Sequence, residues 1–135
     1  MTVKNLIDFI DLYTNNGAIY SKEPWEKDIS IKDESVAFIR SFSHLDWLTL
    51  RHLNLTEKSN FWVEYLIDLL YLAYTEEARQ MIIHIALTGT DENFFDAMEY
   101  IREFKRNIST YTWLKLENRS TEILSKRLKN QSNNY

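Results

Sequence analysis

Apolar residues recur at helical spacing from one end of the chain to the other. In the first segment they are three or four residues apart, and Asn15-Asn16-Gly17 follows them. Such spacing places apolar side chains on one face of a helix, and glycine suits the position just after a helix. The pattern therefore predicts a first helix that ends near Asn15. Its apolar face consists of Val3, Leu6, Ile7, Ile10 and Tyr13.

Residues 18–32 are the least regular stretch, and we predict mostly loop there. Pro24 suits the first turn of a short helix, whereas Ile29 and Ile31 alternate as residues in a strand do.

The remaining pattern predicts further helices, each opened by a side chain that can accept a backbone N–H hydrogen bond. One begins at Asp33 or Ser35 and bends near Ser43, and the apolar set continues to Leu53. The others span 56 or 59 to 74, 75 to 88, 90 to 107, and 109 or 110 to 129, and 131–135 form a polar tail. We therefore predict an all-α fold, a compact bundle of about six helices in a single domain covering 1–135.

Two helix starts resemble each other. Asn60-Phe61-Trp62 and Asn93-Phe94-Phe95 stand 33 residues apart, and each opens a predicted helical hairpin. A period of this length is typical of helical-repeat arrays such as HEAT repeats. Chance similarity between two amphipathic helix starts explains the echo as well, so the two readings stay open.

Composition supports a globular helical domain. The chain has 135 residues, 44% hydrophobic and 27% charged, with two glycines, one proline and no cysteine. So few glycines disfavour tight β-turns and phosphate-binding loops. The absence of cysteine excludes disulfides and thiolate metal sites. We therefore expect no cofactor and no metal.

The apolar stretches also carry acids. Asp8 and Asp11 interrupt the first, which indicates a folded helix and not an export signal. The most apolar run, 61–74, contains Glu64 and Asp68 and is too short to span a bilayer. We therefore expect a cytoplasmic protein that does not enter a membrane.

The net charge of −4 is unevenly distributed. Residues 1–103 carry 18 acids and 9 bases, whereas residues 104–135 carry 7 bases and 2 acids. An acidic body with a basic last helix is consistent with recognition of a charged partner, and the charge also favours solubility.

The helix predicted from Asp91 carries a row of acids. Four carboxylates at steps of four, three and four share one stripe, opposite the apolar residues. The stripe is either a solvated face or a surface that attracts a basic partner. Its members are Glu92, Asp96, Glu99 and Glu103.

The last helix carries a nearly all-positive row, in which Lys115, Arg119, Lys126 and Lys129 are joined by Glu122. These bases suit a helix C-terminus or pair with the acidic stripe across the hairpin. RNA binding is a more specific alternative function for this row, but one basic row on an acidic protein does not favour binding to nucleic acid.

Aromatic residues near predicted loops are candidate anchors for a partner. Trp25 with Glu23, Glu26 and Asp28 is the most suggestive cluster, and Tyr20, Trp47 and Tyr111 also lie near loops or helix starts.

The helix over 61–74 has a narrow polar strip that includes Glu64 and Asp68. Carboxylates one turn apart can bind a metal, but such sites usually recruit histidines and further acids from facing helices. We therefore favour a solvated edge, or pairing of these acids with Arg40 or Arg51.

One short motif suggests catalysis. Arg79 and His84 have the Arg-x4-His spacing that resembles the motif of the HEPN ribonucleases, which are also small helical bundles. The resemblance implies metal-independent RNA cleavage by this pair. Gln80 departs from the Asn or Asp that usually follows the arginine. A histidine among Ile82, Ile83 and Ile85 is more often a partly buried structural residue.

The chain as a whole resembles bacterial immunity proteins of polymorphic or contact-dependent toxin systems. The resemblance lies in its small size, acidic balance, lack of cysteine, and the run FWVEYLIDLLYLAYTEEARQMIIHIALTG followed by the acidic stripe. It implies a non-enzymatic protein that binds and neutralises a basic toxin or nuclease domain. The alternatives are a helical-repeat-like adaptor for another protein and a HEPN-like ribonuclease.

Overall fold

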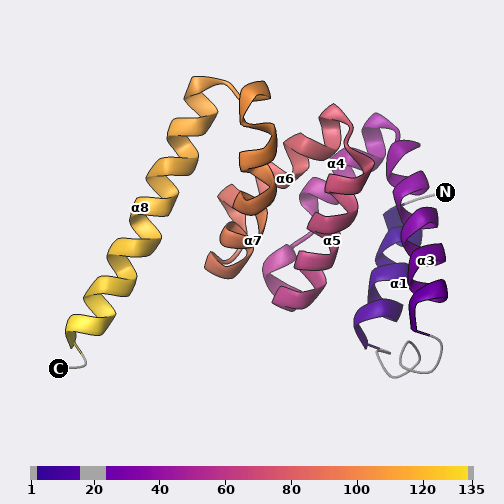
Figure 1. The fold of residues 1–135 in the computed structure, drawn as a ribbon, viewed down its shortest axis with the longest axis horizontal. Helices are drawn as coiled ribbons and strands as arrows, with labels where there is room; N and C mark the ends of the chain where they lie inside the picture. The colour runs from indigo at the N-terminus through magenta and orange to yellow at the C-terminus, as the bar shows by residue number, and fades with distance from the viewer. Residues whose placement is uncertain (1–2, 16–23, 134–135) are drawn as a thin grey trace.

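The protein is all-α in the computed structural model, as the sequence predicts (Figure 1). The structure describes residues 3–15 and 24–133, and the side chains of all of these except 15, 24–31, 132 and 133. No strand occurs in the described residues. The α-helices are α1 (Val3–Asn15), α3 (Pro24–Arg40), α4 (His44–His52), α5 (Asn60–Ala73), α6 (Glu76–Thr88), α7 (Asp91–Ile101) and α8 (Thr110–Asn133), with 3-10 turns at Leu55–Glu57 and Arg102–Asn107.

Side-chain caps set most of the helix starts. The hydroxyls of Ser59, Thr75 and Thr90 accept hydrogen bonds from the backbone of α5, α6 and α7. Ser43 forms a reciprocal capping box with Asp46 at the start of α4, which confirms the predicted break near Ser43. These caps confirm three predicted helix starts, because each satisfies an N–H group that has no partner within its own helix.

The loop predicted over residues 18–32 is wrong for its second half. Helix α3 begins at Pro24, so Ile29 and Ile31 belong to a helix and not to a strand. Pro24 occupies the first helical position, as its fixed φ favours. Further along, Phe38 and Ile39 are buried, and α3 packs against both α1 and α5. The part of α3 whose side chains the structure describes is therefore held by tertiary packing.

Two other predicted helix ends are also shifted. The helix expected to reach Asn107 ends at Ile101, and a 3-10 turn follows it. Phe104 in that turn has non-helical backbone angles (φ −115°, ψ 25°) and is buried. Burial of this ring redirects the chain before α8. The last helix continues past Lys129 to Asn133, so the predicted polar tail is helical up to that residue.

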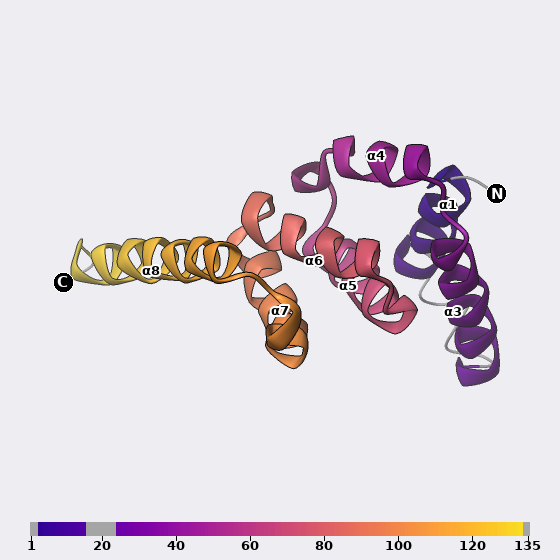
Figure 2. The ribbon, with the colours of Figure 1, turned by 90° about the horizontal axis from the view of Figure 1, so that it is seen from above.

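The helices form two packed rows. One row contains α3, α5 and α7 in that order, and the other contains α1, α4, α6 and α8. Figure 2 shows α4 on one side of the molecule and α7 on the other, with α5 and α6 between them. Successive hairpins thus stack side by side, and α8 is the last element of the stack (Figure 1).

Hydrogen bonds between neighbouring hairpins join residues about 32 apart. Arg40 Nη2 donates to the Leu72 carbonyl, 32 residues away, and the Thr90 hydroxyl to Asn60 Oδ1, 30 residues away. Arg119 Nη2 donates to the Gly89 carbonyl, again 30 residues away. The chain therefore advances by one hairpin about every 32 residues, which is close to the spacing of the sequence echo.

The echoed residues themselves do not occupy equivalent positions. Asn60 is the first residue of α5, whereas Asn93 is the third of α7. Phe61 is 53% exposed, whereas Phe94 is 1% exposed. The repeat therefore lies in the stacking of helices and not in the echoed triplet.

The core is centred on α5 and α6. Both helices bury side chains along nearly their whole length, and the residues of α1, α3, α4, α7 and α8 that face them complete one continuous cluster. Such a core fixes the positions of α5 and α7, the two helices that carry the acidic surface. Its fully buried members include Leu66, Ile67, Leu69, Leu70, Met81, Ile82 and Ile85.

Candidate binding surface

The acidic stripe of α7 faces away from the core, as predicted. Glu92 and Glu99 are exposed and Asp96 is half-buried. The opposite face of α7 is buried through Phe94, Ala97, Met98 and Ile101. The fourth member of the predicted stripe, Glu103, is exposed but lies in the 3-10 turn beyond the end of α7. The helical stripe is therefore one residue shorter than the sequence suggested.

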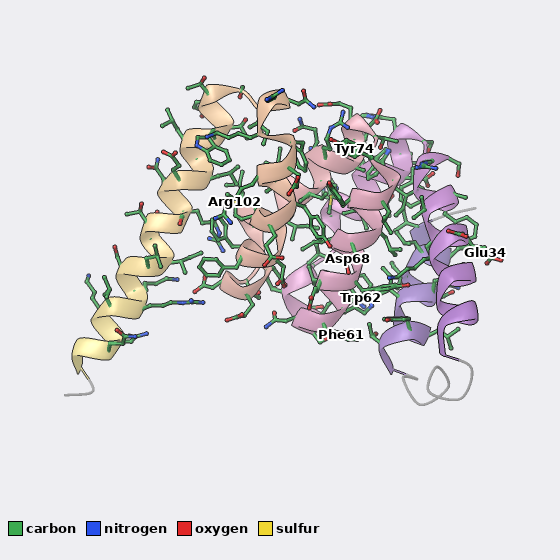
Figure 3. The ribbon with its side chains drawn as sticks, viewed as in Figure 1. Glu34, Phe61, Trp62, Asp68, Tyr74 and Arg102 are labelled. Carbon is green, nitrogen blue, oxygen red and sulfur yellow. The ribbon has the colours of Figure 1, made fainter. Side chains whose placement is uncertain are left out.

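Helix α5 adds two more carboxylates to this surface. Glu64 and Asp68 are 32 residues before Asp96 and Tyr100, and the Tyr100 hydroxyl donates a hydrogen bond to Asp68. Figure 3 shows Asp68 on the side of α5 toward α7. We define the acidic face as the carboxylates of these two adjacent helices. It consists of Glu64, Asp68, Glu92, Asp96 and Glu99.

The predicted pairing of the α5 acids with Arg40 or Arg51 is wrong. Arg40 Nε and Nη2 donate to the carbonyls of Ala73 and Leu72. These carbonyls lie at the end of α5 and have no partner within the helix. Arg51 lies on α4, beside His84. Neither arginine neutralises the acidic face.

The pKa of Asp96 depends on its burial and on the charges of the other four carboxylates of the acidic face. Burial, followed by the charges of Glu64, Glu99, Glu92 and Asp68, raises its pKa from the usual 3.8 to about 6. Burial and then the hydrogen bond to Asp68 also raise the pKa of Tyr100. The Tyr100 hydroxyl therefore remains protonated and keeps donating to Asp68 at neutral pH. Asp96 is the point at which the two helices bring their negative charge together.

We expect the protein to become less stable as the pH rises from about 4 to about 6. In that range folded Asp96 holds a proton that the unfolded chain has released, so raising the pH removes a contribution to folding. The loss is about 1 kcal/mol after allowance for solvent screening of this half-exposed group. Urea unfolding at several pH values measures it. Asp96→Asn should remove this step and be the more stable protein at pH 7.5. Equal pH profiles for the two proteins would contradict the assignment.

The bases of α8 neutralise only the start of α7. Arg119 and Lys126 lie 3.8 Å and 3.7 Å from the Asp91 carboxylate, and Arg127 lies 3.5 Å from Glu92. Within the described part of the chain, no ion pair reaches the other four carboxylates of the acidic face. The two helices do pair across the hairpin, but not through the predicted partners: Arg119 and Lys126 of the row lie by Asp91, outside the stripe, and Glu92 of the stripe lies by Arg127, outside the row. This pairing leaves most of the acidic face without a base.

Apolar side chains border the acidic face on α5. Phe61 and Leu72 are 53% and 48% exposed, and their positions on the helix place them about one turn from Glu64 and from Asp68, respectively. Figure 3 shows Phe61 at the lower end of α5. An exposed aromatic ring beside charged groups is a common anchor in protein interfaces.

The aromatic anchors suggested by the sequence have different outcomes. Trp47 is buried and packs edge-on against Phe42, 5.2 Å between ring centres, so its proposed exposure is wrong. Tyr111 is 69% exposed on α8. Tyr20 and Glu23 lie outside the described residues, and Trp25, Glu26 and Asp28 belong to α3 but their side chains lie outside the described part.

Arg79 and His84 make contacts with different elements. Arg79 donates to the Tyr74 carbonyl and to Glu76, and its guanidinium lies 4.8 Å from the centre of the Tyr74 ring. His84 lies against α4, where burial and then the charge of Arg51 lower its pKa. It lines a hollow of about 170 Å³ with Arg51, Leu53, Asn54, Leu55, Thr56 and Thr88. The arginine thus supports the turn before α6.

We expect no RNA cleavage by this protein. Arg79 is held by the turn and His84 by α4, so neither has the free approach to a common phosphate that the HEPN resemblance implies. Incubation with end-labelled RNA, followed on a gel, tests this. Cleavage by the wild type that disappears in His84→Ala would show that the ribonuclease hypothesis is right.

Within the described residues, no group of histidine, aspartate or glutamate side chains is arranged to hold a metal ion. None of the described helices combines the length and apolar character needed to cross a membrane. Comparison with protein-family models, curated proteins and solved structures gives no match to this chain.

No pattern in the sequence indicates directly that α5 and α7 share one surface. The sequence pattern places Glu64 and Asp68 on a separate edge and assigns no role to Tyr100. The 32-residue step between neighbouring hairpins is the signal that relates Glu64 to Asp96 and Asp68 to Tyr100. This 32-residue step can be recognised in the sequence only when the stacking of the helices is already known.

Proposed function

We propose that this protein is a cytoplasmic, non-enzymatic binding protein that neutralises a basic protein toxin, as its resemblance to bacterial immunity proteins implies. The observation that carries the proposal is the acidic face, four of whose carboxylates form no ion pair within the described part of the chain. Glu64, Asp68, Asp96 and Glu99 form its centre.

The electrostatics of this surface favour a positively charged partner. Like charges held close together are unfavourable for the isolated protein: burial first, and then the charges of the neighbouring carboxylates, raise the pKa of Asp96. A lysine or arginine placed among them removes that repulsion and gains attraction. Part of the binding free energy therefore comes from the loss of repulsion among the protein's own carboxylates, and part comes from the new ion pairs.

The surroundings of the acidic face suit tight association. Phe61 and Leu72 provide exposed apolar area beside the carboxylates, and apolar contacts surrounded by charge are typical of protein interfaces. Both helices are anchored through buried side chains such as Leu66 and Phe94. A surface on packed helices changes little on binding, so the loss of conformational entropy on binding is small.

The remaining charge pattern agrees with a basic partner and not with nucleic acid. Arg119, Lys126 and Arg127 of α8 lie against Asp91 and Glu92. Few bases of α8 are then left to contact a phosphate backbone, and recognition of such a backbone depends on clustered free bases.

Co-expression with the product of the neighbouring gene tests the proposal. If that gene encodes a toxin, cells that produce the toxin should survive when this protein is present. The purified pair should also bind with an affinity that falls as salt rises, because the attraction is screened. Failure to bind the neighbouring product, or binding that ignores salt, would overturn the proposal.

A helical-repeat adaptor is the second candidate, favoured by the stacking of hairpins about every 32 residues. Such stacks commonly present extended surfaces to protein partners. An adaptor is expected to bind a protein of the host cell with no toxin gene nearby, and the same binding experiment therefore separates the two candidates.

A further inference from the structure

The hollow of about 170 Å³ between α4 and α6 is lined by basic and neutral side chains. None of the described residues that line it is acidic, although acids outnumber bases in the chain by 20 to 16. The acidic face lies on other helices, α5 and α7, so the two surfaces are separate. We call this feature the basic hollow. Its polar lining residues are Arg51, Asn54, Thr56, His84 and Thr88.

Two bases from different helices meet at the basic hollow. Arg51 of α4 and His84 of α6 lie close enough that burial, and then the charge of Arg51, lower the pKa of His84. The charge of His52 has a smaller effect in the same direction. Among the described residues, none forms an ion pair with Arg51. Its guanidinium, with five N–H donors, therefore brings positive charge to the hollow that no acid in the lining neutralises.

Asn54 supplies a further hydrogen-bond donor. Its side-chain oxygen accepts hydrogen bonds from the backbone N–H and from the hydroxyl of Thr56. These two bonds fix the orientation of the amide, and within the described part of the chain its NH₂ group donates to no other residue. A guanidinium, an amide NH₂ and an imidazole side by side are donor groups that bind an anion.

We propose that the basic hollow binds the phosphate group of a small molecule. The donors come from α4, from the turn after it and from α6, so an anion with oxygens in several directions reaches more of them than a planar carboxylate does. Arginine in particular recognises phosphate through its fork of N–H groups. The hollow is smaller than the roughly 300–1,000 Å³ of most small-molecule pockets, so one anionic group suits its size. Arg79 does not line it, so this binding involves no pairing of Arg79 with His84.

A neighbouring hollow limits what the phosphate group is attached to. This second hollow, of about 310 Å³, shares Arg51 with the first and is lined on α4 by Phe42 and Trp47. Glu76 and Glu77 also line it, so a second phosphate group there would be repelled. The two hollows together therefore suit free phosphate or a phosphate monoester with an uncharged aromatic body, and they disfavour a diphosphate.

NMR titration of the histidine ring signals with inorganic phosphate tests the proposal. Sodium chloride keeps the ionic strength constant, so that screening of charges does not change during the titration. The His84 signals, assigned with His84→Gln, should shift and reach half-saturation at about 1 mM or below. Bound phosphate should also raise the pKa of His84 by about one pH unit, because a nearby anion favours the protonated ring.

Asn54→Asp changes the basic hollow with little change of shape. The new carboxylate can still accept the hydrogen bonds from Thr56, so the turn should stay folded, but one donor of the hollow becomes a negative charge. Phosphate binding should weaken at least about tenfold, and Arg51→Gln, at an exposed residue, should have a similar effect. Asn107→Asp, at an exposed residue that ends the second 3-10 turn, is the matched control. It changes the net charge as much as either variant and should bind phosphate like the wild type.

Phenyl phosphate distinguishes the two sources of the phosphate group. Tighter binding than that of inorganic phosphate, with a shift of the Trp47 indole signal, would support a monoester, and equal or weaker binding would support free phosphate.

Three outcomes would overturn the proposal. They are His84 signals that do not saturate at the highest phosphate concentration, binding by Asn54→Asp as tight as that of the wild type, and identical shifts when chloride replaces phosphate.

Discussion

Reversing two charges on the acidic face, by Asp96→Lys together with Glu99→Lys, is expected to weaken binding of the proposed basic toxin about a hundredfold or more. Each change removes an attraction and adds a repulsion, and lost charge pairs in interfaces cost about 2–5 kcal/mol. Isothermal titration calorimetry with the purified toxin measures the effect. The same variant should no longer protect cells that produce the toxin.

Glu34→Lys is the matched control for that experiment. Glu34 is an exposed acid on α3, and Figure 3 shows it at the edge of the molecule farthest from α8. The net charge changes as it does at each reversed position, but the acidic face stays intact. Both variants should remain folded, since Asp96 and Glu99 are not core residues. An equal loss of binding free energy per reversed charge in the two variants would show that only the total charge matters, and an affinity unchanged in the double variant would place the binding site elsewhere.

Phe94→Ala is expected to lower the free energy of unfolding by about 3–5 kcal/mol, the usual effect of removing a buried aromatic ring. The ring is 1% exposed, it packs edge-on against Phe95 with 5.3 Å between ring centres, and Arg119 of α8 lies 6.0 Å from it. It therefore anchors α7 from the side opposite the acidic stripe. Thermal unfolding should show a decrease in Tm of about 10 °C.

Phe61→Ala provides the comparison, because the sequence echo places Phe61 and Phe94 in corresponding triplets. Phe61 is 53% exposed and its nearest ring contact, with Tyr13, is 6.2 Å between centres. Its removal should cost less than about 1 kcal/mol. Equal losses for the two variants would mean that the triplets are structurally equivalent after all.

The sequence determined the helical class and most of the helix starts by local chemistry. Apolar spacing predicts amphipathic helices wherever it is regular, and Ser59, Thr75 and Thr90 cap helices because their side chains reach the backbone two or three residues ahead. The outward direction of Glu92, Asp96 and Glu99 follows from the same periodicity. Each of these features depends on residues within about one turn of each other, so the sequence alone carries it.

Only the tertiary structure decided which helices share a surface. Helix α3 packs against α1 and α5 through its later residues, and the buried ring of Phe104 lies where α7 has ended. The combination of Glu64 with Asp96, and of Asp68 with Tyr100, depends on α5 and α7 lying side by side. The two helices lie side by side because apolar side chains from the whole chain are buried together. No local sequence pattern shows which helices such a core brings into contact.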